Sequence, residues 1–236
     1  MKYPTISEYV KASQDASDNL DMSTKATAEE LNEAIMDEFG VKYSKDGRKL
    51  LKAPQNLDGT YSIKEGVRII CDNAFEGRTS LRSFVIPDGV TSIGDMAFMD
   101  CSFLNSVVIP ESVTSIGNHA FGDCCSLTDI VLSDRITTIN EGAFTACSSL
   151  SNLVIPNSVT CIGTWAFMGC SSLNRLVIPE SVTSIGFYAF AFCKSLTNIV
   201  IPDSVTSIGG CAFRCCNIPN DLKQKLISRF GEKIFR

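Results

Sequence analysis

The sequence predicts an α/β repeat solenoid, which we expect to be short, right-handed and capped at both ends. Two observations predict it. An Ala-Phe pair recurs every 23 residues, and four other positions of each repeat are always apolar. The phenylalanines of these pairs are Phe75, Phe98, Phe121, Phe144, Phe167, Phe190 and Phe213. A constant period of this size indicates about seven stacked coils that bury one another's apolar sides in a continuous core.

The repeat that runs through residues 104–127 shows how one coil is built. Residues 107–109 are short and β-branched, which predicts a strand that stacks into a parallel sheet on one face. Pro110 ends this strand because proline cannot donate to the ladder. Residues 114–116 form a second extended piece, and Gly117 turns the chain. We expect the Ala-Phe pair to lie on a short helical turn on the opposite face.

The spacing L-x-x-V-x-I-x-x-S-V-x-x-I is that of leucine-rich repeats, with Ser112 where Asn or Cys is usual. The fuller form I-P-x-S-V-T-S-I-G-x-x-A-F-x-x-C-x-S-L resembles the BspA-like branch of that family over residues 61–216. Members occur in host-associated bacteria and in protozoa. The resemblance implies a protein-binding or adhesion scaffold, commonly at a cell surface, without enzymatic activity.

The flanks of the repeats predict caps. Residues 1–40 form an N-terminal helical segment in this interpretation, with capping boxes at Thr5–Glu8 and Thr27–Glu30 and a helix over 28–39. Asp46-Gly47 predicts a β-hairpin within 41–60 that covers the first coil. The solenoid proper spans 61–216. Residues 217–236 should form a capping helix that Asn220 begins and Gly231 ends.

The composition of the chain limits which kinds of partner and which cellular locations we expect. The net charge of -5 argues against binding duplex nucleic acid. No apolar run approaches the roughly 18–20 residues of a membrane span, so membrane insertion is not expected. The first residues lack the apolar core of a signal peptide, which favours a cytoplasmic location. The family resemblance favours the cell surface instead, and both locations stay open.

The chain has 11 cysteines, and six of them form one column of the repeat. These are Cys101, Cys124, Cys147, Cys170, Cys193 and Cys216, with Arg78 in the corresponding place of the first coil. Stacked coils bring such residues close enough for a disulfide framework. We favour a ladder of small buried thiols, because the number of cysteines is odd and no secretion signal is present. Zinc is disfavoured because no C-x-x-C pair exists.

One candidate binding surface is a valine column in the first strand. It lies between two core columns and should point outward on the concave side of the solenoid. Its members are Val85, Val108, Val131, Val154, Val177 and Val200. An unbroken apolar ladder predicts a docking surface for an extended peptide, another protein or a second copy of this chain. Strand propensity alone is the plainer explanation.

A row of acidic or amide residues follows the same strands. It consists of Asp88, Glu111, Asp134, Asn157, Glu180 and Asp203. We interpret this row as a solvated edge that discourages aggregation of sheets. A rim for a basic partner or a cation is the alternative, although a single file of carboxylates does not converge on calcium.

A second candidate surface lies beside the Ala-Phe turn, where the repeat varies and aromatic residues gather. It consists of Trp165, Met168, Phe187, Tyr188 and Phe192. Exposed aromatic residues are common in binding hot spots, which favours a local protein or carbohydrate contact. Packing against the turn is the plainer explanation.

No catalytic constellation emerges from the sequence. His119 is the only histidine, and a dyad with Cys124 or Cys125 would need a thiol from the buried ladder. No glycine-rich phosphate loop, metal site or cofactor motif is predicted. The sequence therefore favours a non-enzymatic scaffold for an unidentified protein partner. An intracellular scaffold that self-associates, as a homodimer through the valine column or through exposed edges, remains as an alternative. A structural spacer whose specificity lies in residues 1–40 is another.

Overall fold

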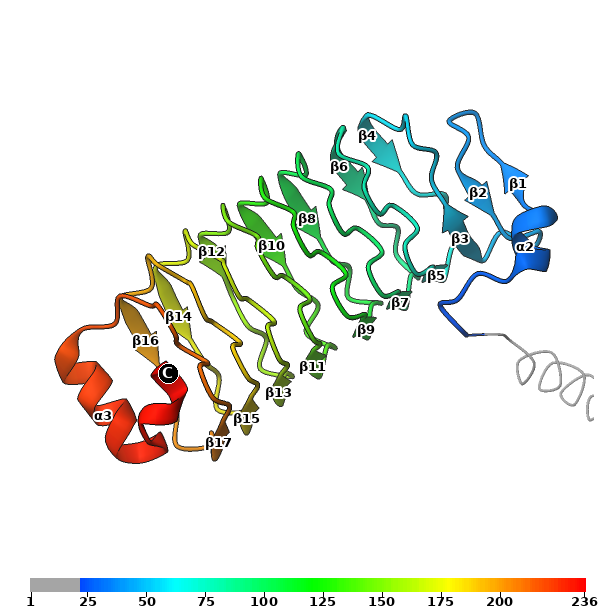
Figure 1. Cartoon of the computed structure of the whole chain (residues 1–236). Helices are drawn as coiled ribbons and strands as arrows, with labels where there is room; N and C mark the ends of the chain where they lie inside the picture. The colour runs from blue at the N-terminus through cyan, green and yellow to red at the C-terminus, as the bar shows by residue number, and fades with distance from the viewer. Residues whose placement is uncertain (1–21) are drawn as a thin grey trace, which may run out of the picture.

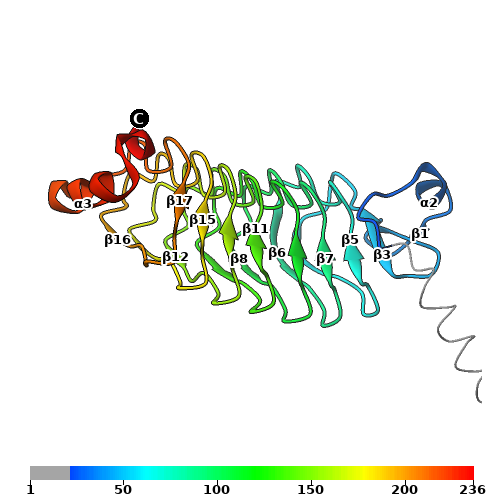
Figure 2. The ribbon, with the colours of Figure 1, turned by 90° about the horizontal axis from the view of Figure 1, so that it is seen from below.

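The protein is an elongated β-solenoid with one cap at each end (Figure 1). The structure, a computed structural model, describes residues 22–236. The solenoid has seven coils, and each coil contributes one strand to each of two faces (Figure 2). The strands of the first face are β4 (Gly59–Ser62), β6 (Leu81–Val85), β8 (Ser106–Val108), β10 (Asp129–Val131), β12 (Asn152–Leu153), β14 (Arg175–Val177) and β16 (Asn198–Val200). We call this side the valine face.

The second face is built from shorter strands that follow in each coil. They are β5 (Ile69–Ile70), β7 (Ser92–Ile93), β9 (Ser115–Ile116), β11 (Thr138–Ile139), β13 (Cys161–Ile162), β15 (Ser184–Ile185) and β17 (Ser207–Ile208). Strands of neighbouring coils pair in parallel, and the register follows the repeat, with Ile130 opposite Val107. Parallel sheets and stacked coils are therefore as the sequence predicted.

Neither face is one uninterrupted sheet. The valine face divides into the groups β4–β6, β8–β10–β12 and β14–β16. The second face divides between β9 and β11, where Asn140 stands in place of the repeat's glycine. The sequence did not indicate these divisions.

A column of stacked phenylalanine rings fills the core. The rings of Phe98 and Phe121 are nearly parallel, with centroids 5.2 Å apart. The same arrangement continues from coil to coil to Phe213. Tyr61 extends the column at the N-terminal end and Phe235 at the C-terminal end. The column positions that the sequence assigned to the core are buried, apart from the half-buried Leu153 and Ile201.

The expected helical turns on the far side of each coil are hydrogen-bonded turns without an α-helix. In the second coil, the amide of Ala97 donates to the carbonyl of Gly94, and the amide of Met99 donates to the carbonyl of Met96. Residues two before and two after each core phenylalanine have positive φ, as at Met96 (+54°) and Asp100 (+60°). A left-handed residue on either side of the phenylalanine prevents a helix from continuing. The described solenoid coils are therefore β-strands and turns.

The N-terminal cap begins with helix α2 (Ala28–Asn32), for which Thr27 and Glu30 form the predicted capping box. The prediction that this helix reaches residue 39 is wrong. Residues Ile35–Met36 instead form strand β1, which pairs antiparallel with β2 (Lys42–Tyr43). Pairing with the hairpin overrides the helical spacing of the apolar residues. The helix predicted near Thr5 lies outside the described residues.

The predicted hairpin is formed by β2 and β3 (Lys49–Lys52), which are antiparallel. Strand β3 then pairs in parallel with β5, so the hairpin extends the second face over the first coil. A buried hydrogen-bond chain attaches the cap: the hydroxyls of Tyr43 and Tyr61 bond to each other, and Tyr61 donates to Asp37 Oδ2 at 2.5 Å.

The C-terminal cap is helix α3 (Asn220–Phe230), followed by the 3₁₀ turn η1 (Glu232–Phe235). Gly231 ends the helix with φ +81°, as predicted. The expected cap at Asn220 is wrong, because Asn220 is already helical and the preceding Pro219 has no side chain that could accept a bond. Turn η1 takes the place of a further coil, since the amide of Phe213 donates to the carbonyl of Ile234 at 2.8 Å.

Candidate functional site

The cysteine column is a structural feature. All 11 cysteines are free thiols, so the alternative of a disulfide framework is wrong. The predicted ladder of buried thiols is correct for five of its six members, and Cys216 is half-buried. Each thiol of the column donates to a phenylalanine carbonyl in the preceding coil, as Cys147 Sγ does to Phe121 O at 3.1 Å. Burial raises the pKa of the Cys170 thiol to about 12. Thiols in this state are poor nucleophiles.

Arg78 closes the ladder at the N-terminal end, a role that the sequence did not reveal. Its guanidinium Nη2 donates to the carbonyl of Ala53 at 2.5 Å, where later coils use a thiol. A charged side chain with several donors suits this end, because the chain just after the hairpin supplies the carbonyl of Ala53 and no coil precedes this one among residues 22–236. The signal in the sequence was the single exception in an otherwise uniform column.

His119 lies beside Glu141 and Gly142 of the next coil. Its Nε2 lies 4.0 Å from Glu141 Oε1, and its ring lies over Gly142. Cys124 is fully buried. Among residues 22–236, no three His, Cys, Asp or Glu side chains are grouped so that they could hold a metal ion. The same part of the chain contains no helix long and apolar enough to cross a membrane.

The valine column points outward, as predicted. The exposed fraction of its side chains ranges from 47% at Val177 to 78% at Val154. The residues on either side of each valine belong to the core, as Val107 and Ile109 do around Val108, although Leu153 and Ile201 are half-buried. The strand alternation therefore places six apolar side chains on the surface in adjacent coils.

Two polar rows flank the valines. The acidic row is exposed at all six of its positions, after the ends of the strands. A mixed polar row precedes the valines by two residues and lies on the same face. Its exposed members are Ser106, Asp129, Asn152, Arg175 and Asn198. Within it, Asn152 Nδ2 donates to Asp129 Oδ1 at 2.9 Å.

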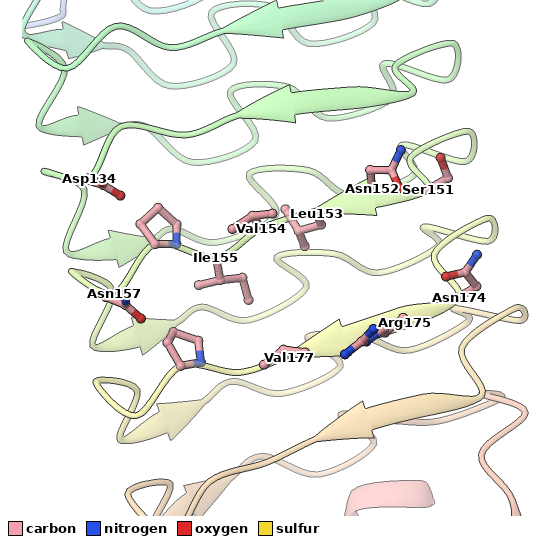
Figure 3. Close-up of a pocket in the computed structure, with 12 residues that line it drawn as sticks. Asp134, Ser151, Asn152, Leu153, Val154, Ile155, Asn157, Asn174, Arg175 and Val177 are labelled. Carbon is pink, nitrogen blue, oxygen red and sulfur yellow. The ribbon is translucent and has the colours of Figure 1, made fainter.

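A hollow of about 560 Å³ interrupts the valine face between β12 and β14 (Figure 3). No strand pairing joins these two neighbours. The amide of Ile155 lacks the bond to Val177 O that Ile178 makes to Val200 O at 3.0 Å in the next coil. Val154, Val177 and two prolines line the hollow, with Asp134 at one end and Arg175 at the other.

The aromatic group at the turns is also at the surface. Phe187 is 59% exposed, while Trp165 and Phe192 are near 40% and Tyr188 and Met168 are half-buried. The amide of Trp165 bonds to Phe187 O at 2.9 Å, which places the group on two neighbouring coils. Its rings do not stack on one another within the described chain. Phe187 instead rests against Gly210.

Three of these aromatic residues have strained backbones. Trp165, Tyr188 and Phe192 have φ of +56°, +55° and +62°, in columns where other coils carry Gly142 or Gly169. A bulky residue with positive φ is uncommon and costs on the order of 1–3 kcal/mol. The left-handed columns are a second feature that the sequence interpretation missed.

A second hollow of about 960 Å³ lies in the N-terminal cap. Apolar residues of α2, β1 and β3 line it, together with the lysines Lys25, Lys42 and Lys52. Ile35, Met36 and Phe39 are each more than half exposed in the same cap. The cap therefore shields the first coil while exposing apolar surface of its own.

Comparison with known families decides the classification. The sequence model of the family described as BspA type leucine-rich repeat region (6 copies) matches this chain over residues 59–174 and 162–236. The chain belongs to this family. No curated protein matches it.

Solved leucine-rich repeat structures of bacteria share the fold of this BspA-type chain. A leucine-rich repeat protein of Eubacterium ventriosum is 29% identical with a TM-score of 0.74, and the match covers 80% of this chain and 51% of that one. The chain thus spans about half the length of that protein. The T. pallidum leucine-rich repeat protein is 27% identical with a TM-score of 0.72, over 86% and 95% of the two chains. The pneumococcal vaccine antigen PcpA, 21% identical with a TM-score of 0.52 over 86% and 47%, shares the fold alone.

Proposed function

We propose that this BspA-type repeat protein is a non-enzymatic scaffold that binds another protein through its valine face. The observation that carries the proposal is the row of six exposed valines, two of which, Val154 and Val177, line the hollow between β12 and β14. Contiguous apolar surface of this kind, rimmed by polar residues, is typical of protein interaction sites. The thiol of Cys124 is buried, and the charged group near His119 is the carboxylate of Glu141, which favours a scaffold over a Cys-His dyad.

The proposal is tested with lysine substitutions on both faces of the solenoid. We expect the Val131→Lys/Val154→Lys variant to lose the proteins that the wild type retains in pull-down experiments. Thr137→Lys/Thr160→Lys is the matched control, because those exposed threonines occupy the second face of the same coils. Equal retention by wild type and both folded variants would remove the valine face as the binding surface.

Self-association through the same face is the first alternative. Light scattering under reducing conditions measures the mass of the wild type and of Val131→Lys/Val154→Lys. A wild-type dimer that becomes a folded monomer would favour self-association over a foreign partner. A monomer in both cases would remove that alternative.

The aromatic group around Trp165 and Phe187 is a second candidate surface, for a local protein or carbohydrate contact. The observation that favours it is the choice of bulky aromatic residues at left-handed positions that every coil has and that other coils fill with Gly142 or Gly169. If this surface binds, Trp165→Gly should relieve strain and raise stability while it weakens binding. A stabilised variant with unchanged binding would mean that the Trp165 ring contributes to neither stability nor binding.

The spacer alternative places specificity in residues 1–40. Its support is the lysine-rimmed hollow of the N-terminal cap. Met36→Asp, in the lining of this hollow, should then abolish partner binding while Val154→Lys leaves it unchanged. The surface location suggested by the family stays a prediction, which surface biotinylation of intact cells would test against the cytoplasmic one.

A further inference from the structure

We propose that the hollow between β12 and β14 binds an extended peptide segment with a cationic side chain at one end and an anionic side chain at the other. This inference rests on the proposed function and names the chemistry of the partner. Asp134 and Arg175, which lie at opposite ends of the hollow in Figure 3, carry the argument.

Both charged groups are available for a partner. The carboxylate of Asp134 and the guanidinium of Arg175 are exposed, and neither has a hydrogen bond or ion pair among residues 22–236. Asp134 takes part in hydrogen bonds only through its amide, which donates to Glu111 Oε2 at 3.1 Å. By contrast, Asp203 of the same acidic row is paired with Arg229 at 3.5 Å.

The floor between the two charges is apolar. Val154 and Val177 lie in the middle of the hollow (Figure 3), and Pro156 and Pro179 also line it. Five residues of strand separate the position of Arg175 from the acidic row, about 16 Å at 3.3 Å per residue. The two coil-to-coil steps from Arg175 to Asp134 add about 10 Å sideways. The diagonal of roughly 19 Å matches an extended segment of about five or six residues.

An extended backbone suits this place because the sheet is unpaired here. Strand β12 pairs only with β10, and β14 pairs only with β16. The amide of Ile155 and the carbonyl of Val177 do not bond to each other, unlike the corresponding groups of Ile178 and Val200. The unbonded amide of Ile155 and carbonyl of Val177 are therefore left for polar groups of a segment that lies across the hollow, while the side chains that line it give specificity.

A second copy of this chain fills the hollow poorly where the axis of a two-fold contact passes through it. In such a contact each copy presents the same depression of about 560 Å³ to the other. Hollow would face hollow, and the space would stay unfilled. A partner segment with its own side chains fills it, and the opposite charges of Asp134 and Arg175 set its direction.

The experiment selects binders from a displayed library of random heptapeptides on the full-length protein. We expect the enriched peptides to carry Lys or Arg near one end, apolar residues in the middle and Asp or Glu near the other end. With Arg175→Glu the library should yield basic residues at both ends, and with Asp134→Lys acidic residues at both ends. A wild-type-selected peptide should bind Arg175→Glu about tenfold more weakly.

The control variant is Asp88→Lys, in the acidic row but outside the hollow, and it should leave the selection unchanged. Enriched peptides that are lost with Val154→Lys but show no charge pattern would overturn this inference and leave the proposed function standing. An absence of peptides sensitive to Val154→Lys would overturn both. A wild-type dimer that dissociates into monomers when a selected peptide is added would assign the valine face to a second copy of the chain.

Discussion

The side-chain amide of Asn140 donates to the carbonyl oxygen of Ile116 at 2.7 Å, and so replaces a backbone bond that other coils make. In those coils a glycine occupies this position, and its amide bonds to the preceding coil, as Gly186 does to Ile162 O at 2.8 Å. A Cβ added at Gly186 would lie 2.5 Å from the carbonyl carbon of Gly163. The glycine is therefore required by close approach of two backbones, and Asn140 compensates with its side chain.

This relationship predicts different costs for two substitutions of Gly186. Gly186→Ala should lower the free energy of unfolding by about 2–3 kcal/mol, because the backbones must separate and the bond is lost. Gly186→Asn should cost about 1 kcal/mol less, because its amide can reach Ile162 O as Asn140 reaches Ile116 O. Urea unfolding followed by circular dichroism measures both. An asparagine variant as unstable as the alanine variant would contradict the compensation.

The 23-residue register allowed the coils, the core columns and the exposed valines to be predicted from the sequence. It did so because every repeat meets the same neighbours, so periodicity reports packing directly. The helix over 28–39 was predicted wrongly because apolar spacing there is ambiguous, and pairing of Ile35 with Tyr43 decides the outcome. The hollow on the valine face could not be predicted from the sequence, because no residue pattern marks the unpaired edges of β12 and β14. The final Gly-Glu-Lys-Ile-Phe, by contrast, repeats the Gly-x-x-Ala-Phe spacing and could have indicated turn η1.

Thiol reactivity should separate the cysteines by burial. Cys125 and Cys215 are exposed, whereas Cys101, Cys124, Cys147, Cys170 and Cys193 are buried. With Ellman's reagent at pH 8, we expect two thiols to react at once and the buried ladder to react only on unfolding. The half-buried Cys161 and Cys216 should react at intermediate rates. Fast reaction of more than four thiols in the folded protein would contradict the buried ladder.

The ladder should also weaken the fold in alkaline solution. Burial raises the pKa of Cys101 and of Cys170 to about 12 from an ordinary value of 9.0. The unfolded chain therefore loses these protons near pH 9 while the folded chain retains them. The stabilisation is complete below pH 9 and is lost as the pH rises toward 12, with a slope of up to about 1.4 kcal/mol per pH unit for each thiol.

Thermal unfolding between pH 7 and pH 11 tests this dependence. We expect the midpoint to be level up to about pH 8.5 and to fall steadily above it. Cys170→Ala should have a lower midpoint at pH 7 and a shallower decline, because one titrating group is gone. Cys125→Ser is the control, since that thiol is exposed and its removal should leave the decline unchanged. An unchanged slope in Cys170→Ala would remove the ladder as its cause.

The last coil depends on turn η1 for its cover. Ile234 is fully buried, and its carbonyl accepts from Phe213, the last member of the phenylalanine column in the solenoid. Ile234→Ala should lower the free energy of unfolding by about 2–4 kcal/mol, through lost burial and the cavity left behind. Lys233→Ala is the matched control, because its exposed side chain contributes little and its backbone carbonyl still accepts from Cys211.

Removal of residues 232–236 should expose the end of the solenoid as well as destabilise it. The amides of Cys211 and Phe213 would lose their acceptors, and the ring of Phe213 would lose its contact with Phe235 at 6.2 Å. An uncovered solenoid end presents an unpaired ladder to other chains, so we expect concentration-dependent association by light scattering. A monomeric truncated chain with the wild-type unfolding midpoint would mean that α3 alone covers the last coil.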